Sequence, residues 1–130
     1  MSEKIVEQIY SILNDFKKQR EDIQGQILIE FPQGVPIVSS WEGNIDPILI
    51  GAVTAAVKLT FTRLCQNLKK GMLQKIIVHN EKGKIIIQNA GPKAILTTIM
   101  PYDADVYAIA FLTLNIVNKI EKLMEKYRPV

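Results

Sequence analysis

A nucleophilic site would need a cysteine or serine near a histidine, and this sequence has one histidine, His79, and one cysteine, Cys65. A catalytic nucleophile needs its base within hydrogen-bonding reach. His79 lies in an apolar run typical of a strand. Cys65 lies three to four residues from Phe61 and Leu68 on a predicted helix, where a packed thiol is expected. We therefore predict that the chain is not an enzyme.

The sequence also lacks the residue patterns of metal-binding and phosphate-binding sites. One histidine and one cysteine cannot provide the four ligands of a structural zinc site, and no acidic cluster has calcium-loop spacing. The pair Gly83-Lys84 lacks the spacing and the Ser or Thr of a phosphate-binding loop. Asp103 and Asp105 precede a predicted helix, which favours capping over a carboxylate pair. No cofactor or metal is predicted.

Composition indicates one folded unit. The 130 residues are 48% hydrophobic, enough for one continuous core, so residues 1–130 are predicted to form a single domain. The formal net charge is +3, but basic and acidic residues alternate in both terminal segments, as at Asp15 and Lys17 or Glu121 and Lys122. This mixing favours solvated helix surfaces over a nucleic-acid interface.

Two apolar stretches, Ile48 to Val57 and Ala108 to Val117, are interrupted by Lys58 and Asn118. Both are shorter than the roughly 20 residues that a membrane span requires. The segment MSEKIVEQIY carries charges where a signal peptide needs an apolar core, and a lone cysteine forms no internal disulfide. We expect a cytoplasmic protein with no membrane insertion.

The order of the elements follows from hydrophobic spacing and turn residues. A helix is predicted over residues 2–20, and alternation predicts a strand over 26–31. Pro32-Gln33-Gly34 then predicts a hairpin turn into a second strand over 35–40. Asn44 or Asp46 can cap a long helix with Pro47 in its first turn, which we expect to end on Gly71.

The remaining chain predicts three strands and a helix. The strands are expected over 73–80, 84–89 and 94–100, and Asp103 or Asp105 can cap the last helix. The fold class is therefore α+β, in the order αββαβββα, with a mainly antiparallel five-stranded sheet sandwiched between helices.

The long helix has two apolar faces on a wheel at about 100° per residue. The face expected to cover the sheet comprises Val53, Val57, Leu64 and Leu68, flanked by Ile50 and Phe61. The opposite face comprises Ile48, Ala52, Ala55 and Leu59, flanked by Lys58 and Arg63. A surface helix normally carries polar residues outward, so an apolar outer face predicts a contact with another molecule. We interpret this outer face, with Arg63, as a partner-docking surface.

Several segments together resemble the Roadblock domain of dynein light chains, a profilin-like fold. They are QILIEF, PQG and PIVSS, then IGAVTAAVKLTFTRLCQNL, QKIIVHNEKGKIIIQNAG and ILTTIMPYDADVYAIAF. The resemblance covers nearly the whole chain and rests on pattern and element order. It implies a five-stranded sheet that becomes ten-stranded in a homodimer, with the long helices side by side.

The resemblance also places residues 73–80 at the sheet edge. An apolar edge strand exposes unpaired backbone groups, and pairing with its own copy across a two-fold axis removes that edge. The predicted dimer interface comprises Leu73, Lys75, Ile76, Ile77, Val78 and His79, with Phe61 and Cys65 of the long helix.

The function that the resemblance implies is a non-enzymatic homodimeric scaffold or regulator. It would dock a small Ras-like GTPase, with modulation of the nucleotide cycle as a further expectation. One alternative is a structural light-chain subunit of a motor or membrane-associated complex, paired with a related Roadblock chain. A small-ligand sensor ranks last, because the interior positions are large aliphatics without the converging polar groups of a ligand pocket.

Overall fold

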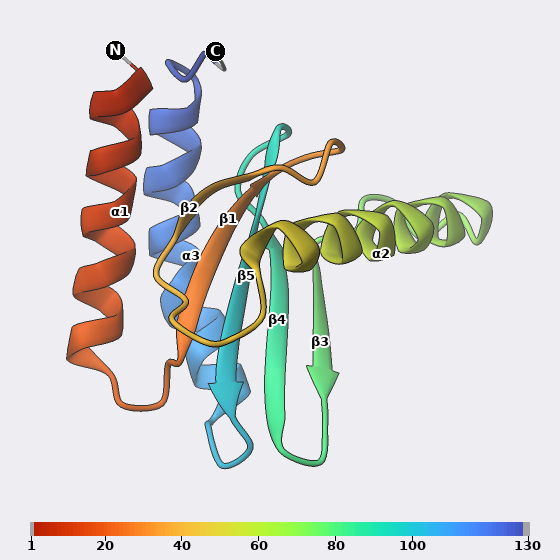
Figure 1. Ribbon diagram of the computed structural model, residues 1–130. Coiled ribbons are helices and arrows are strands. Elements are labelled where there is room, and N and C mark those ends of the chain that lie inside the picture. Colours follow the sequence, from red (N-terminus) through yellow and green to blue (C-terminus); the bar gives the residue numbers. More distant parts are fainter. Residues whose placement is uncertain (1, 129–130) are drawn as a thin grey trace.

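The computed structural model describes residues 2–128, and its element order is the predicted αββαβββα. The elements are α1 (Ser2–Gln19), β1 (Gly25–Glu30), β2 (Pro36–Ser39), α2 (Pro47–Asn67), β3 (Lys75–His79), β4 (Gly83–Asn89), β5 (Ala94–Pro101) and α3 (Val106–Met124). Figure 1 shows α1 and α3 side by side to the left of the sheet and α2 on its other side, extending to the right. The α+β class is therefore confirmed.

The five strands form one antiparallel sheet in the order β2-β1-β5-β4-β3, which places β3 at an edge as expected. Its face toward α1 and α3 packs Leu28 and Leu96 against Ile9 and Ile120. The face toward α2 carries Ile27, Ile29, Ile87 and Ile95. Strand β1 is thus buried on both faces, whereas its alternation predicted one fully buried face.

Turn and cap residues account for the helix starts. The Asp46 side chain accepts a hydrogen bond from the Ile48 N–H, with Pro47 in the first turn, so Asp46 rather than Asn44 is the cap of α2. Asp105 likewise caps α3 through the Ala108 N–H. Gly34 adopts φ 79° in the turn that leads to β2, as the hairpin signal predicted.

The end of α2 differs from the prediction. The helix ends at Asn67, and the left-handed residue that forms its stop is Lys69, with φ 57°; Gly71 is also left-handed, with φ 84°, but lies two residues further on. The Lys70 N–H donates to the Cys65 carbonyl and the Lys69 N–H to the Gln66 carbonyl, which is the Schellman arrangement. A lysine therefore holds the strained position that glycine usually occupies.

The rotation of α2 about its axis also differs from the prediction. Its buried residues are Gly51, Thr54, Ala55 and Lys58. Three residues expected to cover the sheet are instead about half exposed, namely Val53, Leu64 and Leu68. A side chain at Gly51 would meet the Gly34 carbonyl oxygen at 2.3 Å, so the helix approaches the β1–β2 turn too closely for a bulky face.

Only the first part of α2 packs on the sheet, chiefly against β1 and β2. No α2 residue after Lys58 is buried, and the second part of the helix projects beyond the strands (Figure 1). The long helix is therefore held to the domain only through its first half.

Candidate interaction surfaces and a pocket

The residues with the most reactive side chains lie apart. His79 is exposed at the end of β3, with its ring 6.3 Å from that of Tyr107, and Cys65 is half-buried on α2. Within residues 2–128, no group of three or more His, Cys, Asp or Glu side chains could hold a metal ion.

At the open edge of the sheet, two hydrogen bonds show which backbone groups of β3 face β4 and which face outward. The Asn80 N–H donates to the Gly83 carbonyl, and the Asn89 N–H donates to the Gln74 carbonyl. Backbone groups alternate sides along an antiparallel strand, so residues 74, 76, 78 and 80 face β4. The N–H and C=O groups of Lys75, Ile77 and His79 therefore point away from the sheet, toward any strand added at this edge.

Two apolar flanks of α2 lie about 100° to either side of Lys58 on a helical wheel. We call one the Leu64 flank; its members are Val53, Phe61, Leu64 and Leu68, all exposed. The other is the Leu59 flank, made of Ile48, Ala52, Leu59 and Arg63. On it only Leu59 is half-buried, while Ile48 is 66% exposed.

The predicted docking set needs one correction. Ala55 is 4% exposed, because it lies against Gly34 in the β1–β2 turn, so it cannot contact a partner. The other four predicted docking residues form the Leu59 flank. Of the predicted dimer residues, Phe61 is exposed and Cys65 half-buried on α2, while Leu73 and the residues of β3 lie along the open edge.

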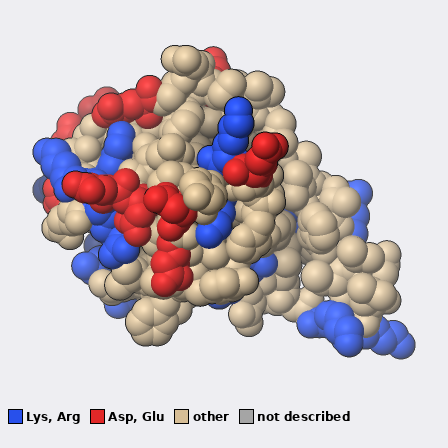
Figure 2. Space-filling model, turned by 90° about the horizontal axis from the view of Figure 1, so that it is seen from below, with Lys and Arg blue, Asp and Glu red and all other residues tan. Residues whose placement is uncertain are grey.

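The segment from α2 to the end of β3 carries basic side chains but no acidic ones. Residues 47–80 contain no Asp or Glu, and their Lys and Arg residues are Lys58, Arg63, Lys69, Lys70 and Lys75. Figure 2 shows mixed charges over the body of the domain, whereas the part projecting to the right carries Lys or Arg but no acidic side chain. The mixed charge predicted from the terminal segments therefore does not extend to α2 and β3.

The length and composition of α2 would also suit a helix that crosses a membrane. In the described part of the chain it is the one helix long and apolar enough to cross a membrane, a test that core helices of soluble proteins also pass. Most of α2 is exposed, and its apolar character is divided between two flanks separated by Lys58. This division is typical of a helix that contacts protein on both sides rather than lipid all round.

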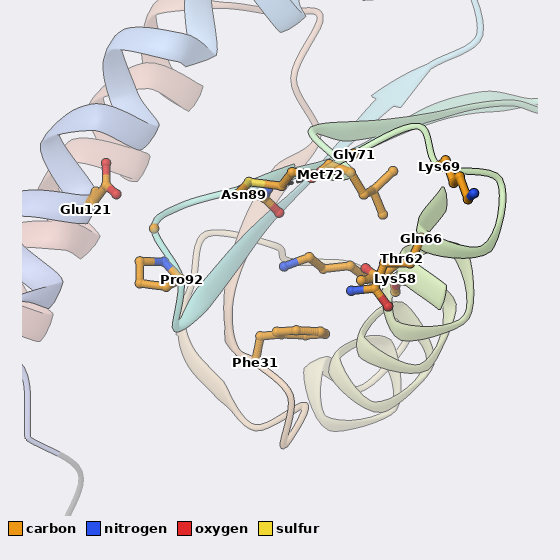
Figure 3. Close-up of a pocket in the computed structure, with 12 residues that line it drawn as sticks. Phe31, Lys58, Thr62, Gln66, Lys69, Gly71, Met72, Asn89, Pro92 and Glu121 are labelled. Carbon is orange, nitrogen blue, oxygen red and sulfur yellow. Dashed lines mark hydrogen bonds between the residues drawn. The ribbon is translucent and has the colours of Figure 1, made fainter. Parts of the chain in front are cut away.

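A pocket between α2, the Phe31 turn and the β4–β5 loop was missed by sequence reasoning. Its volume is about 830 Å³, and Figure 3 shows Lys58 extending into it between Phe31 and Asn89. Lys58 was predicted to flank the docking face, yet it is only 8% exposed, with its ammonium 3.8 Å from the centre of the Phe31 ring. Burial lowers the pKa of this lysine.

No family model matches the sequence, and no curated protein sequence matches it either. Solved structures do match the fold. MglB of Myxococcus xanthus has a TM-score of 0.85 at 14% identity, over 96% of this chain and 93% of that one. MglB of Thermus thermophilus, described as a gliding protein, has a TM-score of 0.81 at 15% identity, over 94% and 92%.

A Roadblock/LC7 domain from Streptomyces avermitilis matches with a TM-score of 0.82 at 9% identity, over 90% of this chain and 98% of that domain. Coverage is nearly complete in both directions, while the identities are low enough that only the fold is established. The Roadblock fold predicted from sequence is confirmed: this chain folds as a Roadblock/LC7 domain.

Proposed function

We propose that this protein is a non-enzymatic homodimeric platform that docks a small Ras-like GTPase. The observation that supports it best is α2, a projecting helix with an exposed apolar flank on each side. One flank serves self-association, and the other is available for a partner. The Roadblock resemblance supplies the class of partner, because prokaryotic members of that family associate with small Ras-like GTPases.

Self-association uses the open edge of β3. Outward backbone groups of Lys75, Ile77 and His79 would pair with the same strand of a second copy, giving a ten-stranded sheet. The Leu64 flank, including Phe61, would cover the equivalent helix of that copy. One MglB structure with this fold has a tetrameric arrangement, so assembly of copies has a precedent among similar structures.

Docking uses the Leu59 flank. Ile48 is its most exposed apolar side chain, and Arg63 adds a cation in a region without acidic residues. Apolar anchors provide most of the affinity of such a contact, while the surrounding charge speeds association with an oppositely charged surface. The partner surface is therefore expected to be apolar with an acidic margin.

The test is capture of a small GTPase encoded beside this protein in its genome. Ile48→Asp should weaken binding by at least tenfold, about 1.4 kcal/mol, without changing the melting temperature, because the side chain is exposed. Thr60→Asp is the matched control: it adds the same charge at an exposed α2 position outside both flanks. Equal capture by wild type and Ile48→Asp would remove the Leu59 flank as the docking surface.

A membrane is the competing occupant of this flank. Sedimentation with vesicles of phosphatidylcholine and phosphatidylserine separates the two, since a basic apolar helix would bind anionic lipid without any GTPase. Vesicle binding by wild type that Ile48→Asp abolishes would contradict the platform. Absence of vesicle binding, together with GTPase capture, supports it.

A further inference from the structure

The pocket around Lys58 shares only Leu73 with the surfaces proposed for dimerisation and docking. Its α2 residues Lys58, Thr62 and Gln66 line one side of the helix, between the two apolar flanks, and Lys69 follows just after the helix end. Phe31, Asn89 and Pro92 close it from the sheet side (Figure 3). The pocket is therefore a separate feature that needs its own explanation.

The central observation is a buried cation without a counter-ion. Among residues 2–128, neither a hydrogen bond from the Lys58 ammonium nor an ion pair to it is present; its one partner is the face of Phe31. A cation–π contact offsets only part of the cost of removing an ammonium group from water. An anion in the pocket would supply the missing partner and the missing hydrogen-bond acceptors.

Two other polar groups of the pocket are already occupied. The Thr62 hydroxyl donates to the Lys58 carbonyl, and the Asn89 side-chain amide donates to the Leu73 carbonyl. Much of the remaining wall is apolar, with Phe31, Met72 and Pro92. The other charged side chains of the lining, Lys69 and Glu121, are exposed. One buried, unsatisfied charge beside an apolar wall matches a ligand with one charged end and an apolar body.

The same lining argues against a doubly charged ligand. Glu121 of α3 lies at the far side of the pocket (Figure 3), so a phosphate dianion would face a negative charge across it and only one buried cation. A carboxylate carries the single charge that Lys58 can neutralise. A pocket of about 830 Å³ lies within the range for small organic ligands.

We propose that this pocket binds a small organic monocarboxylate with an apolar body, whose carboxylate pairs with Lys58 and whose body lies against Phe31 and Met72. The site would make the platform responsive to a metabolite. It is independent of the GTPase, because a carboxylate site could exist whether or not the Leu59 flank docks a protein.

The test uses the whole protein and three probes: 4-phenylbutyrate, the neutral 4-phenylbutan-1-ol and inorganic phosphate. Binding is followed by NMR through the Lys58 Cε–H and the Met72 methyl signals, together with the pKa of Lys58 measured from the same Cε–H. Phenylbutyrate should shift both signals and raise that pKa, because an ion pair favours the charged amine. It should bind at least about tenfold more tightly than the alcohol.

Two variants complete the design. Lys58→Met keeps the length and apolar stem but removes the charge, and should lose at least about tenfold of the affinity for phenylbutyrate. Lys69→Met is the matched control, because Lys69 also lines the pocket but is exposed, and its affinity should stay within about twofold of wild type.

Three results would overturn the proposal. Equal binding of the alcohol and the carboxylate would mean an apolar cleft only, and competition by phosphate at equal concentration would mean a phosphate site. Wild-type spectra that do not respond to phenylbutyrate would exclude the site without reference to any variant. GTPase capture is measured separately, so failure here leaves the docking proposal to its own test.

Discussion

Replacing Ile77 by proline tests the strand-pairing interface most directly. The Ile77 N–H points away from β4, so proline removes a donor from the open edge and leaves the β3–β4 ladder unbroken. The Ile77 side chain is half-buried against the cluster around Ile86, so the fold should lose only about 1 kcal/mol of packing.

The effect on the dimer is larger because a two-fold axis doubles it. Each copy loses one intermolecular hydrogen bond, worth about 1 kcal/mol, and leaves a partner carbonyl unpaired at a further cost of about 1 kcal/mol or more. The total of roughly 4 kcal/mol corresponds to about a thousandfold weaker dimer. A dimer of about 0.1 µM dissociation constant would become mostly monomeric at the tens of micromolar used in light scattering.

The assay is gel filtration with light scattering over a dilution series, with thermal melting in parallel. Val78→Pro is the matched control: its N–H faces β4, so it should lower the melting temperature much more than Ile77→Pro does. If Ile77→Pro stays dimeric with a normal melt, β3 is not the interface. If Ile77→Pro and Val78→Pro lower the melting temperature equally, the assignment of which β3 backbone groups face β4 is wrong.

Three further predictions concern the fold and the pocket. Lys69→Gly should stabilise the domain by about 1 kcal/mol, raising the melting temperature by about 3 °C, because Lys69 holds φ 57° at the end of α2; an unchanged or lower melting temperature would contradict this. Gly51→Ala should cost about 2 kcal/mol or more in urea unfolding, despite the helix propensity of alanine, because its Cβ would meet the Gly34 carbonyl oxygen. Lys58→Met should be more stable than wild type at pH 7 by about 1 kcal/mol. The lowered pKa means that the folded state releases the Lys58 proton before the unfolded state does, so wild-type stability rises relative to Lys58→Met as the pH approaches 10.5, and the gap between their melting temperatures should narrow.

Element order and caps were predictable because their signals are local. Asp46 with Pro47 marks a helix start, and Gly34 marks a turn, whatever the rest of the chain does. The rotation of α2 was not predictable, because apolar residues lie on both sides of a strip that contains Gly51, Thr54 and Lys58. Hydrophobic spacing identifies an apolar face but cannot show that the helix packs through the narrow strip between two such faces.

The pocket was hidden for a different reason. The burial of Lys58 depends on Phe31, which is 27 residues earlier in the chain and reaches the lysine only after the β1–β2 turn folds beneath α2. No spacing rule connects those two positions. A lysine in a helix is ordinarily expected at the surface, and only the tertiary structure shows that this one has its ammonium over an aromatic ring.

Because α2 is attached to the domain at one end only, its two ends should differ in local stability. Its first turns are fixed where Gly51 meets Gly34, while the turns after Lys58 have no buried residue to hold them. In an isolated copy, amide hydrogens should therefore exchange with solvent faster toward Asn67 than near Gly51. A second copy that covers the end of α2 near Asn67 would slow exchange there. The difference in exchange rate between the two ends of α2 would therefore show whether copies have assembled.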